Sequence, residues 1–176
     1  MLVVDVESTC WERTPPPGES SDIIEIGVCL LDVKTLERSM KRSLLVRPAR
    51  SQVSEFCTKL TTITPETVAD APSLAEACAE LEKEYSSRER TWFSHGDYDR
   101  KQFEENCRAL GARYPFSPTH VNAKALFALM RGMKRAPGMA EALRILELPL
   151  EGTHHRGADD AWNIAAIVAW ILARGR

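Results

Sequence analysis

Asp5 and Glu7 interrupt an otherwise apolar stretch near the start of the sequence, residues 2–9. Apolar side chains recur along this stretch with a period of two, which is typical of a β-strand, so the two carboxylates project from the same face. A carboxylate that is buried without a partner is strongly unfavourable, and the usual partners are basic side chains or metal ions. The first Lys or Arg of the sequence is Arg13. The pair is therefore a candidate site for a hard divalent cation, which prefers oxygen ligands.

This spacing alone is not specific, because acidic residues two apart also occur elsewhere, for example at Glu80 and Glu82. Those two lie in a helical pattern, and we expect them on a solvated face. Asp5 and Glu7 differ because they end a run of β-branched residues, and open α/β sheets place their sites at the C-terminal ends of strands. Taken alone, the stretch leaves a catalytic or metal-binding role and an incidental acidic pair both open.

Two more acidic residues are expected to point inward from helix starts. Asp99 falls in the first turn of a predicted helix, on the face that carries Phe103 and Cys107. Asp160 holds the same position in the last predicted helix, whose corresponding face is a row of aliphatic residues (Ile164, Ile167, Val168 and Ile171). Asp97, by contrast, is explained as an N-cap. Three inward acidic positions, together with His155 on a glycine-containing loop, favour a catalytic or metal site over three separate caps.

The elements that must position these residues can be placed from hydrophobic periodicity. Strands are predicted over residues 2–9, 23–32 and 39–46, and their short connections indicate an antiparallel meander. Shorter strands follow over residues 90–94 and 120–123, with helices from about 74, 98, 124, 137 and 158, and residues 48–64 are expected to be irregular. The fold class is therefore α/β, a mixed five-stranded sheet of three meander strands plus two parallel strands, flanked by helices in one domain of residues 1–176.

Composition narrows the class of protein. The chain has 176 residues, 44% of them hydrophobic, and a net charge of -2, which argues against a protein that coats nucleic acid by bulk electrostatics. Five scattered cysteines without a CxxC spacing favour neither a disulfide framework nor a zinc site, so we expect them reduced. The strand pattern begins at residue 2, so we expect no signal peptide before it. The longest apolar run is about half of what a bilayer crossing needs. We expect a soluble cytoplasmic protein with no membrane partner.

Three motifs resemble, in order and spacing, those of the DEDDh 3'→5' exonucleases of the DnaQ-like superfamily, which has a ribonuclease H-like fold. They are Asp5-x-Glu7-x-Thr9-Cys10, Gly96-Asp97-Tyr98-Asp99, and residues 155–165, His-Arg-Gly-Ala-Asp-Asp-Ala-Trp-Asn-Ile-Ala. Residues 60–64 and 121–124 are similar to the Eri-type and KapD-like branch, whose members include enzymes that trim RNA 3' ends. The resemblance spans residues 2 to about 170. It departs at Thr62, where the branch often has Gly, and at Arg100, where an apolar residue is common.

The resemblance implies that Asp5, Glu7, Asp99 and Asp160 hold two divalent cations, Mg²⁺ or Mn²⁺, with Asp5 bridging them. In two-metal sites the ions lie about 3.5–4 Å apart and stabilise the attacking and leaving oxygens of an in-line displacement. His155 would accept the proton of the attacking water, since an ordinary histidine pKa of about 6.5 suits a base near neutrality. The product would be a nucleoside 5'-monophosphate.

Substrate contacts are expected close to these motifs. By resemblance, Ser8 and Thr9 meet the terminal nucleotide, and Thr61 belongs to the matching segment 60–64. Trp11 lies beside the first motif and is suited to stacking on a base, although an ordinary exposed tryptophan on a loop explains it equally well. Arg156 is a candidate phosphate contact, against the alternative of a solvated arginine.

The sequence contains a register ambiguity, because His154 and Asp159 have the same separation as His155 and Asp160. Adjacent helical residues point about 100° apart, so the two aspartates cannot face the same ions. The row of Asp160 is aliphatic and should face the sheet, whereas the row of Asp159 is mixed. We therefore expect His155 and Asp160 to be the working pair.

Three functions remain under consideration. The first is a 3'→5' exonuclease that acts on single-stranded RNA ends or short 3' overhangs. The second is the same reaction on DNA ends, which would be distinguished by contact with the 2'-hydroxyl. The third is a non-catalytic module that binds nucleic acid or protein, which is disfavoured because all four carboxylates and the histidine are present.

Overall fold

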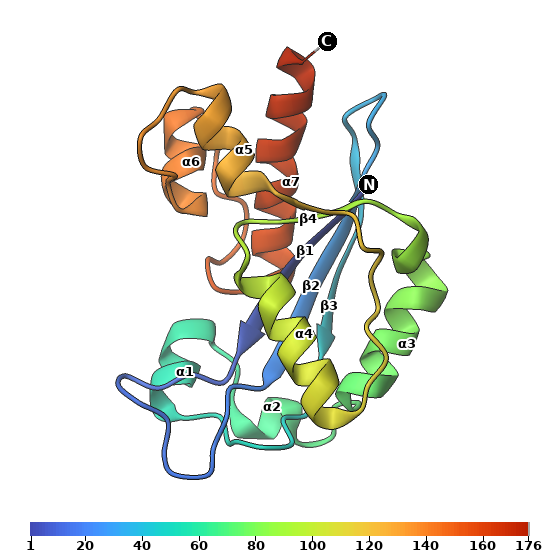
Figure 1. The fold of residues 1–176 in the computed structure, drawn as a ribbon. Coiled ribbons are helices and arrows are strands. Elements are labelled where there is room, and N and C mark those ends of the chain that lie inside the picture. The colour runs from blue at the N-terminus through green and yellow to red at the C-terminus, as the bar shows by residue number, and fades with distance from the viewer. Residues whose placement is uncertain (176) are drawn as a thin grey trace.

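A computed structural model describes residues 1–175 and contains a five-stranded sheet in the order β3-β2-β1-β4-β5 (Figure 1). The strands are β1 (Leu2–Ser8), β2 (Ile23–Leu31), β3 (Arg38–Leu45), β4 (Trp92–Ser94) and β5 (His120–Asn122). The first three form an antiparallel meander, whereas β4 is parallel to β1 and β5 is parallel to β4. The predicted mixed sheet is confirmed, including the number and direction of its strands.

Helices cover both faces of this sheet. One face is covered by α3 (Leu74–Tyr85) and α4 (Tyr98–Leu110), and the other by α5 (Ala123–Met130), α6 (Met139–Ile145) and α7 (Gly157–Arg174) (Figure 1). None of the helices described in residues 1–175 combines the length and apolar character that a membrane crossing requires.

The alternation of β1 decides which face receives its carboxylates. Leu2, Val4 and Val6 are buried against α3 and α4, whereas Val3 is buried against α7. Since successive side chains of a strand point to opposite faces, Asp5 and Glu7 lie on the α7 side, as expected from their spacing.

The prediction that residues 48–64 are irregular is wrong at its end. This part of the chain contains α1 (Glu55–Thr61), followed directly by α2 (Pro65–Ala69). The side chain of Ser54 caps the start of α1 by accepting a hydrogen bond from the backbone of Cys57, and Thr62 ends it in the left-handed conformation, with φ at 64°. Both helices pack in a small apolar cluster with Ile24. They lie beyond the C-terminal end of β1, so they form part of the rim of any site located there (Figure 1).

The predicted role of Asp97 is also wrong in part. Asp97 occupies the N-cap position of α4, but its side chain makes no capping hydrogen bond. Its Oδ2 instead accepts a hydrogen bond of 3.1 Å from the side-chain amide of Asn122, at the end of β5. The predicted end of α4 is correct, since Gly111 adopts a left-handed φ of 64°.

Candidate active site

A cavity of about 310 Å³ lies at the C-terminal end of β1, where β1, α1, α4 and α7 meet. Its walls include the five residues that were predicted to be catalytic, Asp5, Glu7, Asp99, His155 and Asp160. A larger hollow of about 630 Å³ lies elsewhere, beside the turn between β2 and β3. That hollow brings no comparable group of acidic and histidine side chains together, so the chemistry points to the smaller cavity.

Asp5, Glu7 and Asp160 form an acidic cluster on the α7 side of the sheet. Each offers an oxygen atom, and these three atoms lie within 4.8 Å of one another. Burial, together with the charges of Asp99 and Glu7, raises the pKa of Asp5 well above its ordinary value. Burial and the charge of Asp160 raise the pKa of Glu7 to about 8. Within residues 1–175, neither Asp5 nor Glu7 forms an ion pair, so a bound cation would stabilise the charged form of the cluster.

Asp99 reaches the cavity from α4, on the opposite side of the sheet. Its side chain is buried, and its Oδ1 accepts a hydrogen bond of 3.0 Å from the backbone of Val6. Burial raises its pKa to about 6, even though the hydrogen bond to Val6 acts in the other direction. Asp99 therefore lines the same cavity as the acidic cluster but lies outside the group of three oxygens that are within 4.8 Å.

The two adjacent aspartates at the start of α7 point in different directions. Asp160 is buried in the cavity, with 5% of its surface exposed. Asp159 turns away from it, since its Oδ1 lies 2.5 Å from Lys41 Nζ and its Oδ2 accepts a hydrogen bond of 2.7 Å from the backbone of Thr153. The structure therefore brings Asp160, and not Asp159, to Asp5 and Glu7.

His154 and His155 both line the cavity, although the sequence favours His155 alone. Nδ1 of His154 lies 2.9 Å from Oδ2 of Asp160, while the backbone N–H of His155 donates to the same oxygen over 3.0 Å. The two rings stack with their centroids 3.9 Å apart, and His155 adopts a positive φ of 65°. Burial and the neighbouring His154 lower the pKa of His155 below 6.5.

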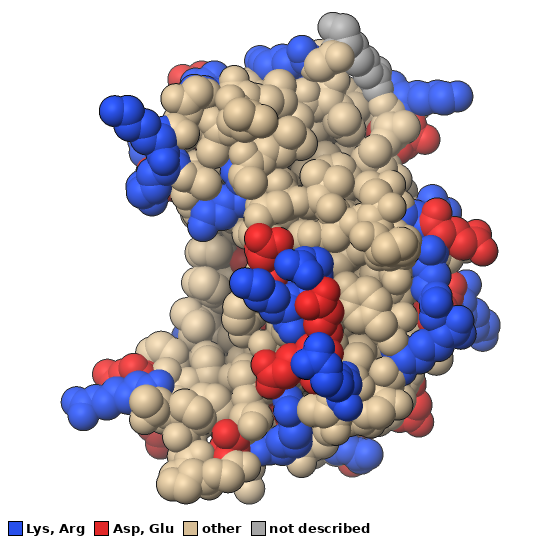
Figure 2. Space-filling model, viewed as in Figure 1, with Lys and Arg blue, Asp and Glu red and all other residues tan. Residues whose placement is uncertain are grey.

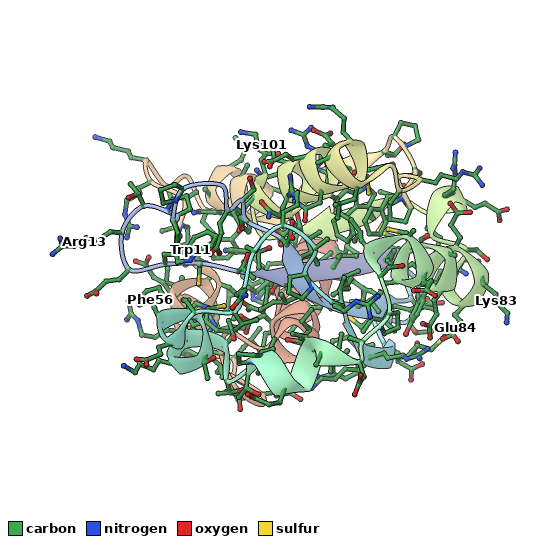
Figure 3. The ribbon with its side chains drawn as sticks, turned by 90° about the horizontal axis from the view of Figure 1, so that it is seen from below. Trp11, Arg13, Phe56, Lys83, Glu84 and Lys101 are labelled. Atoms are coloured by element: carbon green, nitrogen blue, oxygen red, sulfur yellow. The ribbon has the colours of Figure 1, made fainter. Side chains whose placement is uncertain are left out.

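Among the predicted substrate contacts, only Ser8 is brought to the cavity wall. Its Oγ is buried and has no hydrogen-bond partner within residues 1–175. Thr9 is fully buried, and its hydroxyl contacts Ser51 Oγ at 2.6 Å and accepts a hydrogen bond from the backbone of Asp22. Trp11 lies on the loop that follows β1, on the same side as Arg13 and Phe56, and it does not line the cavity (Figure 3).

Two of the predicted contacts are occupied within the protein. Thr61 is fully buried, and its hydroxyl donates to the carbonyl of Cys57 over 2.9 Å. The guanidinium of Arg156 is held against the carboxylate of Glu25, with Nε 3.2 Å from Oε2. The structure thus brings neither residue to the cavity, because a neighbouring acceptor within the chain already engages each one.

Several cavity residues were missed by the sequence analysis, namely Cys10, Leu60, His95, Tyr98 and Met139. Leu60 lies in the matching segment 60–64 and Tyr98 in the motif of residues 96–99, so the resemblance could have identified both as cavity residues. Met139 comes from the start of α6, and only the tertiary fold brings it near. His95 Nε2 lies 3.1 Å from the carbonyl of Pro137, and burial lowers the pKa of His95 to about 4, so the neutral ring donates this hydrogen bond.

Comparisons with known proteins agree with this geometry. A family model described as "Exonuclease", of the RNase T type, matches residues 2–168. The human protein "3'-5' exoribonuclease 1" is 29% identical over 185 residues, which cover 99% of this chain and 53% of that protein. The chain thus spans about half the length of that relative.

Two solved structures carry the comparison further. The nuclease domain of 3'hExo, described as a DEDDh family member bound to rAMP, superimposes with a TM-score of 0.88 at 28% identity, covering 99% of this chain and 92% of that one. A 3'-exonuclease solved for its 3'-end specific recognition of a histone mRNA stem-loop gives a TM-score of 0.89 at 28% identity, covering 99% of this chain and 63% of that one. The likeness extends over the whole sheet and its helices.

Proposed function

Because the chain belongs to the RNase T-type exonuclease family, we propose that it is a 3'→5' exonuclease that releases nucleoside 5'-monophosphates from RNA ends. The substrates are single-stranded 3' ends or short 3' overhangs. The observation that carries the proposal is the cavity at the end of β1, where four carboxylates and three histidines meet. The whole chain, residues 1–176, would act as one catalytic domain, which is supported by the single sheet with both faces covered; Arg176 itself lies outside the described residues.

The donor set suits hard divalent cations, in agreement with the likeness to the nuclease domain of 3'hExo, which is described as a DEDDh family member. Asp5, Glu7 and Asp160 offer converging oxygens, and Asp99 lines the same cavity. Burial, together with mutual repulsion that cations would relieve, raises the pKa values of Asp5 and Glu7. We assign two ions to these four residues, and either Mg²⁺ or Mn²⁺ fits oxygen ligands of this kind. When bound, such cations polarise the scissile phosphate and lower the pKa of a coordinated water.

The protein itself would supply the proton acceptor. His155 lines the cavity, and its lowered pKa keeps the ring neutral near pH 7, so a ring nitrogen can accept a proton from the attacking water. The backbone of His155 is tied to Asp160 by its N–H, which holds the residue at the edge of the acidic cluster.

The terminal nucleotide would be held by groups of the cavity wall. The unpartnered Oγ of Ser8 can donate to or accept from the sugar or phosphate. Leu60 and Tyr98 are partly exposed beside it and offer apolar surface for a base. Trp11, on the loop after β1, remains a candidate for a base further from the 3' end (Figure 3).

Charge distribution supports a path for the rest of the strand. Residues 106–140 contain no acidic residue but six basic ones, although the whole chain has a net charge of -2. Figure 2 shows Lys and Arg side chains gathered over α5, α6 and their connection. This basic arm (Lys124, Arg131 and Lys134) adjoins the cavity, since Lys124 lies close enough to His95 to lower its pKa, whereas the neighbouring Arg135 is paired with Glu141. Lysines and arginines placed in this way attract the phosphates of a nucleic acid.

RNA is favoured over DNA because the human relative is described as an exoribonuclease and the similar nuclease domain of 3'hExo was solved bound to rAMP. We also propose a cytoplasmic location, which is supported by the five unpaired cysteines, since reducing compartments keep thiols unpaired.

The proposal is tested with end-labelled single-stranded RNA, single-stranded DNA and blunt duplexes of one sequence, each with Mg²⁺, Mn²⁺ or EDTA. We expect RNA to shorten from its 3' end only when a metal is present, with single-stranded RNA ahead of DNA and duplex. Stronger activity on DNA would reassign the substrate. Binding without cleavage under all metal conditions would favour a non-catalytic module.

A further inference from the structure

Glu25 is a buried carboxylate that the proposed reaction does not use. It lies in β2, where its backbone pairs directly with Glu7 of β1, and none of its surface is exposed. A fully buried acid next to an acidic cluster is electrostatically unfavourable, and its charge raises the pKa values of both Asp5 and Glu7. An apolar residue would avoid this repulsion, so the contacts of Glu25 must explain its presence.

Those contacts converge on the segment that precedes Asp160. The backbone N–H of Gly157, the first residue of α7, donates to Oε2 of Glu25 over 2.9 Å. Nε and Nη2 of Arg156 donate to the two carboxylate oxygens over 3.2 Å each. Ser43, from β3, donates its hydroxyl to Oε1. The carboxylate therefore holds two consecutive residues between His155 and the aspartates of α7.

The start of α7 is pressed onto the sheet at the same place. A Cβ added to Gly27, two residues after Glu25, would lie 1.8 Å from the carbonyl carbon of Gly157. Gly27 in turn pairs with Asp5 across the β1–β2 ladder. The first turn of α7 thus sits directly against the strand pair that carries the acidic cluster, and Glu25 fixes it there.

Resting on the proposed function, we propose that Glu25 is a positioning residue for the reaction and that Arg156 is its partner rather than a phosphate contact. Together they form a clamp, defined as Glu25, Arg156 and the backbone N–H of Gly157, which sets the start of α7 so that Asp160 and His155 face Asp5 and Glu7. A weaker contact of 3.4 Å from Nη1 of Arg156 to the hydroxyl of Thr62 extends the clamp to the end of α1, the helix that carries Leu60 on the cavity wall.

The two roles of Arg156 make different kinetic predictions. An arginine that binds substrate phosphate contributes to KM, and its removal acts independently of Glu25. A clamp residue acts through the placement of Asp160 and His155, so its loss lowers kcat. The losses in kcat from substituting Glu25 and Arg156 should not add, because either substitution breaks the same pair.

The test is a double-mutant cycle of Glu25→Gln and Arg156→Gln, measured as kcat and KM on single-stranded RNA with saturating Mn²⁺. Each single variant should lower kcat by roughly tenfold or more with KM changed less than about twofold, and the double variant should fall within about twofold of the worse single variant. Lys41→Ala is the matched control, since it breaks the ion pair of Asp159 in the same helical turn, and kcat should stay near that of the wild type.

An Arg156→Gln variant with a raised KM and an unchanged kcat, or fully additive losses, would overturn the clamp. If Glu25→Gln fails to fold, Arg156→Gln and Arg156→Lys still test the clamp. Both should fold, because the side chain of Arg156 is one-third exposed.

A second measurement does not depend on activity. The Mn²⁺ concentration that gives half of the maximal increase in Tm should be several-fold higher for both clamp variants than for the wild type, because Asp160 is displaced. An inactive wild type would contradict the proposed function alone, and the Mn²⁺ midpoints would then decide the clamp, with unchanged midpoints overturning it.

Discussion

At the scale of single residues, the histidine pair is where sequence and structure differ most. The sequence singles out His155, and His155 does line the cavity, but the ring nitrogen closest to Asp160 belongs to His154. The contact of His154 is made to the carboxylate of Asp160, which is one of the four groups that would hold the proposed cations. Bound cations would compete with His154 for this carboxylate, so we expect activity to depend less on His154 than on the proton acceptor His155.

This difference gives a prediction for two matched variants. His155→Gln should lower kcat by roughly 100-fold or more, as expected for loss of a general base, while its RNA affinity stays close to that of the wild type. His154→Gln should retain most of the activity. The rate of the wild type should fall at acidic pH with an apparent pKa below 6.5, since burial lowers the pKa of His155 and imidazolium cannot accept a proton. Stopped-flow cleavage at several pH values measures both, and a reversed ranking of the two variants would place the base at His154.

Glu7 gives a prediction about stability in the absence of metal. Its pKa is about 8 in the folded protein, against an ordinary value of 4.5, so between these pH values the folded state binds more protons than the unfolded chain. The stability linked to Glu7 is therefore complete below pH 4.5 and is lost as the pH rises to about 8. In EDTA, Tm of the wild type should fall between pH 5 and 8.5 by roughly 4 °C or more relative to Glu7→Gln, about 1–2 kcal/mol for a chain of this size. Parallel Tm curves for the two proteins would contradict the raised pKa.

The residue patterns predicted on which face of a strand or helix a side chain lies, but they did not predict which group that side chain contacts. The inward row of Asp160 and the shared face of Asp5 and Glu7 follow from periodicity, and both are seen in the structure. The engagement of Thr61 by the Cys57 carbonyl, and of Arg156 by Glu25, depends on contacts that periodicity does not encode. Glu25 itself looks like an ordinary polar position in an apolar strand, so its role could be found only from the fold.

At the scale of elements, the five strands and the helices from α3 onward in the chain were predicted, whereas the short helices α1 and α2 were not. β1, β2 and α7 bury continuous apolar rows, and the bounds of β1 to β3 and α7 differ from the predicted ones by no more than one or two residues. α1 and α2 have 7 and 5 residues, so each shows too few turns for a helical period to emerge. Their formation depends on caps at Ser54 and Thr64 and on packing against β2.

The contact between β2 and the start of α7 can be tested by adding one carbon atom. Gly27→Ala places a Cβ against the backbone of Gly157, which cannot move without shifting α7. Overpacking of this kind typically costs about 1–3 kcal/mol, so Tm should fall by roughly 4 °C or more and cleavage should be largely lost. Gly138→Ala is the control, because nothing lies within 4 Å of its added Cβ and φ is -66°. Thermal unfolding of both variants measures the difference, and equal Tm values would show that α7 is not held at this point.

At the scale of the whole molecule, an acidic chain is proposed to bind an acidic polymer. The acidic cluster would bind cations, and the basic arm on α5 and the connection to α6 lies next to the same cavity (Figure 2). The opposite end of the molecule carries mixed charge, with Lys83 beside Glu84 on α3, far from Trp11 and Arg13 (Figure 3). The uneven distribution, rather than the net charge, is what suits the surface to RNA.

The basic arm predicts a dependence on substrate length. The double variant Lys124→Glu, Lys134→Glu should raise KM for a 20-nucleotide RNA by roughly 3–10-fold. The slope of log KM against log salt concentration should fall by about one for each phosphate contact that is lost. KM for a dinucleotide should change much less, because a dinucleotide has fewer phosphates to meet the arm. Lys83→Glu adds the same kind of charge change on the far side and should leave both values unaltered. An equal rise in KM for short and long RNA would argue against the arm as a path for the strand.

The claim that the cavity at the end of β1 is a metal-dependent 3'→5' exonuclease site is tested most directly by following the terminal nucleotide. RNA labelled in its last nucleotide is incubated with Mn²⁺ and either the wild type or Asp5→Ala, and the released label is identified by chromatography. The wild type should release the label first, as a nucleoside 5'-monophosphate, and EDTA should stop the release. Asp5→Ala should be nearly inactive while its metal-free fold is at least as stable as that of the wild type, because a like-charge repulsion is removed. Release of the label by Asp5→Ala at a rate near that of the wild type would contradict the assignment.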